Sequence, residues 1–245
     1  MRRTERIRRA GPAAGRPTKC WTAGVRRPRG RGAGMDICDL GCGDGSYGRS
    51  LLDQGCHSYR GVDASERMVE AARSALQGTQ AQVTRERIEE LTLADESFDL
   101  VLSRMTFHWI EELAPVFAQV FRALRPQGRL VFSVEHPVLT CCDAAREEGQ
   151  GRSSWVVDDY FVPGPRVSHW FGVRVRKYHR SIEQYFQLLR NQGFEVEDLR
   201  EATPSAEQIT GGCRVAAAPA RAGDALAGGT QGVAGESAAD LARKA

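Results

Sequence analysis

Residues 36–45 read DICDLGCGDG, and this stretch decides the fold class. Its first five residues are typical of a short buried β-strand. The three glycines at alternate positions let the main chain turn sharply and let a ligand approach its N–H groups. The residues that follow, SYGRSLLDQG at 46–55, have helical spacing and end near a terminating Gly55. A strand, a glycine turn and a helix in this order predict an α/β protein.

The alternation of strands and helices continues to about residue 210. Further strands are expected at YRGVD, AQVTR, SFDLVLS, RLVFSVEH and FEVEDLRE, with Ser65 capping the second helix and a helix in EELAPVFAQVFRALRPQG that ends at Pro126 and Gly128. Strands separated by helices form βαβ units, which predict a doubly wound, mostly parallel sheet of the Rossmann-like kind. Ligands of such sheets bind beyond the carboxyl ends of the strands, so the loops there are expected to hold the site.

Composition divides the 245 residues into three parts. Residues 1–34 carry ten arginines, Lys19 and only Glu5, a net charge of +10 within a chain total of +3, so the rest is acidic. We expect residues 1–34 to form a disordered basic arm, and residues 211–245, with 7 Gly and 12 Ala, a disordered tail. The folded domain is then expected at 35–210, with 138–180 as a lid-like insertion.

Composition also argues against several classes of protein. No uncharged apolar run approaches the roughly 18 residues that span a bilayer, so no membrane segment is expected. The seven cysteines show neither a CxxC pair nor a metal-ligand spacing, and we expect no metal, reduced thiols and a cytoplasmic protein without a signal peptide. Since the basic charge lies only in residues 1–34, a nucleic-acid partner is not expected.

Asp63 stands eighteen residues beyond Gly45, at the end of the second expected strand. A carboxylate there can accept two hydrogen bonds from a ribose diol. The glycine pattern is GxGxG, with Ser46 at the last position of the dinucleotide fingerprint GxGxxG, and Asp39 and Asp44 would repel a pyrophosphate. A ligand that carries ammonium and sulfonium charges would be attracted instead. This favours S-adenosylmethionine over NAD, with an NAD-dependent oxidoreductase as the alternative.

Four stretches in order resemble class I S-adenosylmethionine-dependent methyltransferases of the small-molecule type: DICDLGCGDGSYG, YRGVDASERMVEAAR, IEELTLADESFDLVLSRMTFHWI and LRPQGRLVFSVEHP. The resemblance implies methyl transfer from S-adenosylmethionine to O, N or C of a small-molecule acceptor. It also implies a seven-stranded sheet whose final strand is antiparallel. No apolar run near the C-terminus matches that strand, so it is expected to be missing, and a non-catalytic, truncated protein is a further alternative.

The resemblance also assigns roles to single positions. The residues it implies for cofactor binding are Asp39, Gly41, Cys42, Gly43, Gly45, Asp63, Ala64, Met68, Ile88 and Ser103. Of these, Ile88 would contribute its main-chain amide and Ser103 its carbonyl. His108 is expected between cofactor and acceptor. His136 is the candidate base because the ordinary pKa of histidine lies near neutrality. Structural alternatives stay open for Met68 as a core residue and for both histidines as hydrogen-bonded supports.

Overall fold

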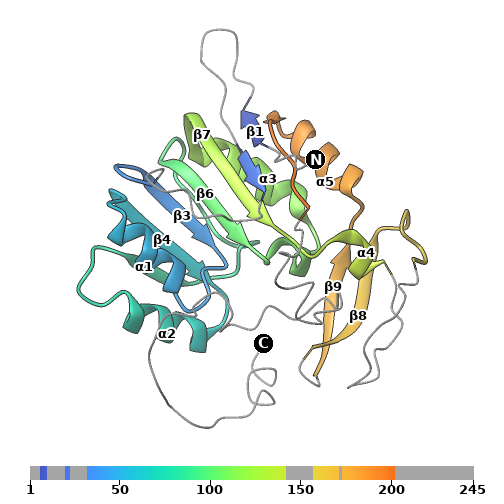
Figure 1. Cartoon of the computed structure of the whole chain (residues 1–245), viewed down its shortest axis with the longest axis horizontal. Coiled ribbons are helices and arrows are strands. Elements are labelled where there is room, and N and C mark those ends of the chain that lie inside the picture. Colours follow the sequence, from blue (N-terminus) through green and yellow to red (C-terminus); the bar gives the residue numbers. More distant parts are fainter. Residues whose placement is uncertain (1–5, 10–19, 23–31, 142–156, 171–172, 202–245) are drawn as a thin grey trace, which may run out of the picture.

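A computed structural model describes residues 6–9, 20–22, 32–141, 157–170 and 173–201 (Figure 1). The main sheet has the order β10-β1-β2-β7-β6-β3-β4-β5. Its strands are β1 (Arg6–Arg9), β2 (Cys20–Thr22), β3 (Asp36–Leu40), β4 (Ser58–Asp63), β5 (Gln82–Arg85), β6 (Phe98–Arg104), β7 (Leu124–Ser133) and β10 (Phe194–Val196). The helices are α1 (Ser46–Asp53), α2 (Glu66–Ala75), η1 (Phe107–Trp109), α3 (Leu113–Ala123), α4 (Pro137–Thr140) and α5 (Ile182–Asn191).

The five strands β5, β4, β3, β6 and β7 are parallel, which confirms the predicted doubly wound sheet. Adjacent residues of β3 point to opposite faces, and each face has its own buried cluster. Ile37 packs in the cluster that contains residues of α1 and α2, whereas Cys38 packs in the one that contains residues of α3 and α5. The strand order reverses between β3 and β6, so the switch point that favours ligand binding lies at their carboxyl ends.

Local signals in the sequence predict some of the element boundaries, whereas strand pairing moves others. Helix α2 begins after Ser65, whose hydroxyl accepts from Met68 N at 3.4 Å, as predicted. Helix α3 ends at Ala123, earlier than predicted, because Leu124 already pairs with Phe98 as the first residue of β7. The last predicted strand is also shorter than FEVEDLRE, since β10 spans only Phe194–Val196.

The sheet continues beyond β7 with strands from both sides of the parallel core. Strand β2 is parallel to β7, and β1 runs antiparallel to both β2 and β10. These two strands lie within the expected disordered arm 1–34, so the expectation of disorder is corrected for their residues. They also raise the sheet from the seven strands that the resemblance implies to eight. Since an open edge of β7 would present unpaired N–H and C=O groups, the parallel strand β2 covers that edge, and β1 then adds an antiparallel strand to a sheet whose final antiparallel strand was expected to be missing. Residues 211–245 lie outside the described residues.

The connection 138–180 contains a two-stranded hairpin of β8 (Gly164–Trp170) and β9 (Val173–His179). Figure 1 shows the hairpin beyond the carboxyl ends of the parallel strands, next to α4. His179 links it to its surroundings, with Nδ1 2.8 Å from Thr140 Oγ1 and Nε2 2.8 Å from the Tyr160 carbonyl oxygen. Among the described residues, no helix combines the length and apolar character needed to cross a bilayer.

Candidate active site

The glycine turn after β3 is tightly packed at both ends and open in its middle. Gly41 has φ +78°, and a Cβ there would lie 2.2 Å from Thr106 Oγ1. Gly45 has φ +75°, and its Cβ would lie 2.9 Å from the Ala72 Cα of α2. At Gly43, by contrast, a Cβ would meet nothing within 4 Å in the part of the chain that the structure describes. The sequence therefore needs glycine to form the turn, and the turn leaves room above Gly43.

The carboxylate of Asp63 lies directly against this turn. Its Oδ2 accepts from Gly43 N at 2.9 Å, and its Oδ1 accepts from Ser65 N at 2.9 Å. The turn is also bound to the end of β4, because the main-chain N–H groups of Gly41 and Cys42 both donate to the Val62 carbonyl oxygen. A carboxylate has about four acceptor sites, so two main-chain donors leave capacity for ligand hydroxyls.

Asp39 is buried at the end of β3 and is only partly satisfied. Its Oδ2 accepts from the Tyr59 hydroxyl at 2.9 Å, whereas its buried Oδ1 has no hydrogen-bond partner among the described residues. Burial raises the pKa of Asp39, and the nearby charge of Arg104 together with the Tyr59 hydrogen bond opposes that rise. An unpartnered buried oxygen is costly, so it indicates a place where a ligand donor is expected.

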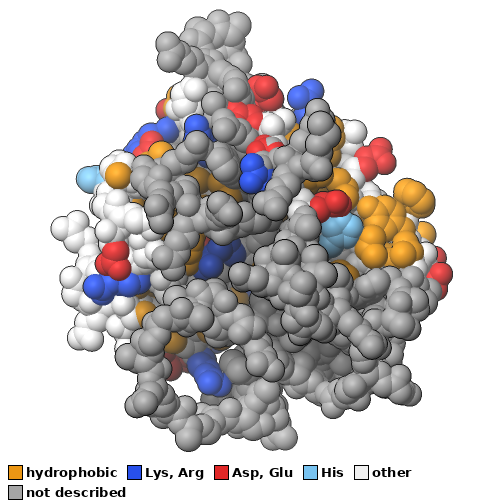
Figure 2. Space-filling model, viewed as in Figure 1, with side chains coloured by type: hydrophobic (Ala, Val, Ile, Leu, Met, Phe, Trp, Pro, Cys, Tyr) orange, Lys and Arg blue, Asp and Glu red, His pale blue; other side chains and the backbone are white. Residues whose placement is uncertain are grey.

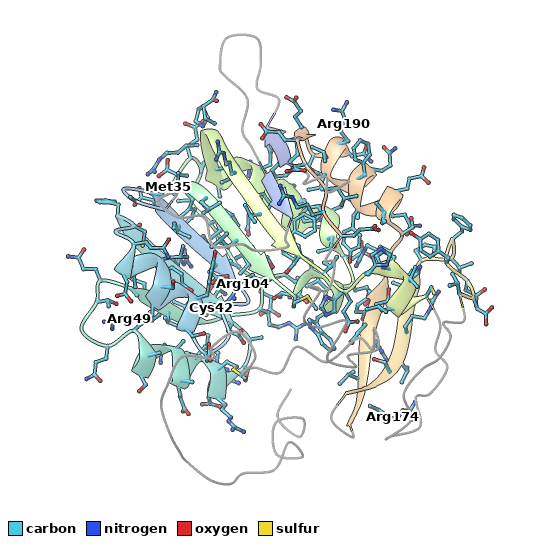
Figure 3. All side chains as sticks on the ribbon, in the orientation of Figure 1. Met35, Cys42, Arg49, Arg104, Arg174 and Arg190 are labelled. Atoms are coloured by element: carbon cyan, nitrogen blue, oxygen red, sulfur yellow. The ribbon has the colours of Figure 1, made fainter. Side chains whose placement is uncertain are left out.

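Arg104, which the sequence analysis did not single out, lies at the same end of the sheet. It is the last residue of β6, and its guanidinium carbon lies 4.1 Å from the centroid of the Tyr47 ring in α1. Its Nε is buried without a hydrogen-bond partner in the described part of the chain. Figure 3 shows Arg104 near Cys42 of the glycine turn. A charged residue at the end of a buried strand was the sequence signal that could have identified it.

Three further predicted residues are Ala64, Met68 and Cys42. Ala64 is exposed and Met68 is half-buried, and both lie where α2 begins, beside Asp63. Cys42 is buried, and burial raises the pKa of its thiol, so it remains protonated. Because the Cys42 side chain is buried, it packs within the protein, and only its main chain is available to a ligand.

Ile88 and Ser103 are both buried. The Ile88 side chain packs in the core cluster that covers one face of the sheet, so only its main chain is available to a ligand. The Ser103 hydroxyl donates to the Leu40 carbonyl oxygen at 2.9 Å. This bond links the ends of β3 and β6 directly below the glycine turn. The roles of the Ile88 amide and the Ser103 carbonyl stay predictions.

His108 lies in η1, beyond β6, within a second polar cluster. It is 2 % exposed, and its Nδ1 accepts from Glu135 N at 3.4 Å. Burial, together with the charge of Lys177, lowers the pKa of His108 to about 3. Lys177 Nζ donates to Glu135 Oε1 at 2.6 Å and lies 5.1 Å from the Trp109 ring centroid. No sequence pattern reveals this pair, because Glu135 and Lys177 lie 42 residues apart.

His136 follows β7 and lines a surface pocket that does not include the glycine turn. Its Nδ1 accepts from Val138 N at 3.2 Å, which caps α4, and its Nε2 lies 2.6 Å from Glu201 Oε1. It lines a pocket of about 720 Å³ together with Val157, Asp159, Tyr160, Phe161, Val162 and Ile182. Figure 2 shows hydrophobic side chains gathered beside a histidine on this side of the molecule. Because both ring nitrogens of His136 already have these contacts, its role as a base stays a prediction.

Comparison with known proteins identifies the family. A profile described as "Methyltransferase domain" matches residues 38–132. The crystal structure of an S-adenosylmethionine-dependent methyltransferase from Mesorhizobium loti is 35% identical, with a TM-score of 0.69, over 76% of this chain and 85% of that one. The chain belongs to the S-adenosylmethionine-dependent methyltransferases. The predicted family is thereby confirmed, and the comparison decides against the NAD-dependent oxidoreductase.

Two relatives of this methyltransferase show how far the similarity extends. An uncharacterized protein of Haemophilus influenzae is 31% identical over 178 residues, 69% of this chain and 70% of that protein. A malonyl-[acyl-carrier protein] O-methyltransferase of Methylococcus capsulatus is 34% identical over 177 residues. That match covers 69% of this chain and 57% of the relative's length.

S-adenosylmethionine is the cofactor of this methyltransferase, and the residues at the glycine turn fit its chemistry. The unpartnered Asp39 Oδ1 suits an ammonium donor, and the free acceptor capacity of Asp63 suits a ribose diol. The space above Gly43 leaves room for the ligand between them. Within the described ranges, no group of three or more His, Cys, Asp or Glu side chains is placed to hold a metal ion.

Proposed function

We propose that this methyltransferase transfers the sulfonium methyl group of S-adenosylmethionine to an O, N or C atom of a small-molecule acceptor. The acceptor binds beside the carboxyl ends of β6 and β7, between the glycine turn and the hairpin β8–β9. The observation that supports this most directly is the 2.9 Å hydrogen bond from Gly43 N to Asp63 Oδ2. It brings the ribose acid and the turn to one edge of the sheet, next to the open space above Gly43.

In this proposal the protein acts chiefly by positioning. Asp63 accepts hydrogen bonds from the ribose hydroxyls, and Asp39 accepts one from the ammonium group. The bound cofactor supplies an electrophilic methyl group. The residues around it keep the acceptor atom in line with the methyl–sulfur bond and exclude water, which makes the displacement effectively unimolecular.

The histidines have distinct proposed roles. His108 stays neutral at physiological pH because burial lowers its pKa to about 3. Since its Nδ1 accepts from Glu135 N, its Nε2 carries the proton and can donate to an acceptor oxygen. His136 is the proposed base for an acceptor that must lose a proton. To accept that proton at Nδ1, it would have to release the Val138 N–H.

The same proposal includes a lid over the acceptor and a cytoplasmic location. Within the segment 138–180, the hairpin β8–β9 acts as a lid over the acceptor, since it lies beyond the strand ends where the acceptor binds (Figure 1). The protein is cytoplasmic, because Cys38, Cys42, Cys56 and Cys141 are buried free thiols, as expected of a reducing compartment.

The test is formation of S-adenosylhomocysteine. The full chain is incubated with S-adenosylmethionine and pools of small hydroxylated, amino and carboxylate compounds, and the demethylated cofactor is measured. Product that depends on one pool and decreases in the Asp63→Ala variant at limiting cofactor concentration supports the proposal. Binding of S-adenosylhomocysteine without turnover on any pool would instead support a non-catalytic relative, and no binding at all would overturn the assignment of the cofactor site.

A further inference from the structure

Two buried polar atoms of opposite charge lack partners beside the glycine turn. One is Oδ1 of Asp39 and the other is Nε of Arg104, and neither has a hydrogen-bond partner among the described residues. A buried charged group without a partner is unfavourable, so such an atom in a functional site indicates a missing ligand group. Two such atoms of opposite sign indicate a ligand with both a cationic and an anionic group.

The two residues lie on neighbouring strands and face the same turn. Asp39 pairs with Leu102 across β3 and β6, and Arg104 follows two residues later. Arg104 is close enough for its charge to influence the pKa of Asp39, yet no ion pair joins them in the described part of the chain. The Tyr47 ring, 4.1 Å from the guanidinium carbon, holds Arg104 over the first turn of α1. The charges are thus near each other but separated.

We infer that Arg104 binds the α-carboxylate of the cofactor's methionine group while Asp39 faces its ammonium group. This inference rests on the proposed function, because it places the amino-acid end of S-adenosylmethionine at the glycine turn. An amino-acid zwitterion carries its two charges on atoms attached to one carbon, and it satisfies both unpartnered atoms at once. Guanidinium suits this task because its planar donors match the geometry of a carboxylate.

The test separates the carboxylate from the rest of the cofactor. Isothermal titration uses three ligands: S-adenosylhomocysteine, its decarboxylated analogue and 5′-methylthioadenosine, which lacks the whole amino-acid group. In Arg104→Gln, affinity for S-adenosylhomocysteine is expected to fall about 10- to 100-fold, the range for losing a hydrogen bond to a charged group. The affinities for the other two ligands are expected to stay within about twofold, because neither carries a carboxylate.

Arg49→Gln is the matched control, since Arg49 is an exposed arginine of α1 that pairs with Asp53 at 3.1 Å (Figure 3). It should bind all three ligands as the wild type does. Arg104→Lys keeps the positive charge and should recover part of the lost affinity, and thermal melting shows that each variant is folded. If Arg104→Gln is unfolded, Arg104→Lys carries the test, with a smaller loss expected for S-adenosylhomocysteine alone.

Two results would overturn the inference. Unchanged affinity of Arg104→Gln for S-adenosylhomocysteine would show that no carboxylate contact exists. An equal loss for all three ligands would show that Arg104 only supports the turn. Failure of the cofactor site itself is distinguishable, because the wild-type protein would then bind none of the three ligands, whereas failure of methyl transfer alone would leave binding intact and abolish only turnover.

Discussion

The main-chain N–H of Gly43 donates a 2.9 Å hydrogen bond to Oδ2 of Asp63, twenty residues further along the chain. This bond connects the turn after β3 with the end of β4, two adjacent parallel strands. In the proposed cofactor site, the turn offers N–H groups and the strand end offers a carboxylate to the nucleoside.

Replacing Asp63 by alanine should weaken binding of S-adenosylhomocysteine by about 10- to 100-fold, because the ribose loses charge-assisted hydrogen bonds. Isothermal titration measures the change. Asp53→Ala removes an exposed carboxylate from α1 and serves as the control, with no expected effect on affinity. Equal affinities of Asp63→Ala and the wild type would remove Asp63 from the site.

Replacing Gly41 by alanine should destabilise the protein by more than the usual cost of a left-handed residue, about 1–2 kcal/mol. The added Cβ would lie 2.2 Å from Thr106 Oγ1, so η1 or the turn would have to shift. Gly55→Ala is the matched control, because Gly55 has φ +85° but its Cβ position meets no atom of the described residues within 4 Å. Urea unfolding should show the larger loss at Gly41, and equal losses would contradict the steric argument.

Acid should destabilise the fold partly through His108. Its pKa falls from 6.5 to about 3 on folding, so the unfolded chain takes up the proton first as pH drops. The neutral histidine therefore makes its full contribution to the free energy of unfolding above about pH 6.5. That contribution is lost progressively as the pH falls from 6.5 to 3. A His108→Gln variant should lose less thermal stability than the wild type between pH 7 and pH 5. If the melting temperatures of the two proteins fall by the same amount between pH 7 and pH 5, His108 does not have this role.

The Lys177–Glu135 pair predicts a strong coupling. Lys177 is 7 % exposed, so Lys177→Met should leave Glu135 without its partner and cost roughly 1–3 kcal/mol of stability. The double variant Lys177→Met with Glu135→Gln should recover much of that loss, because no uncompensated charge remains. A double-mutant cycle by urea unfolding measures the coupling, and simple additivity of the two changes would show that the pair is not coupled.

The sequence by itself determined the elements whose signals are local. The glycine turn at 41–45 follows from alternate glycines after an apolar strand, and the start of α2 follows from Ser65 as its N-cap. Asp63 could be assigned because it ends a strand at a fixed distance beyond the turn. These features depend on residues a few positions apart or on a spacing that the parallel sheet imposes, so the residue order alone encodes them.

Only the tertiary structure decided which distant segments meet. Arg6–Arg9 form β1 because β2 and β10 offer pairing partners, and an arginine-rich stretch has no local pattern that signals this. Arg104 became a candidate only beside Asp39, and Lys177 only beside Glu135, 42 residues away. Contacts of this kind depend on how whole strands pack against each other, and the energy that selects them is absent from any short window of the sequence.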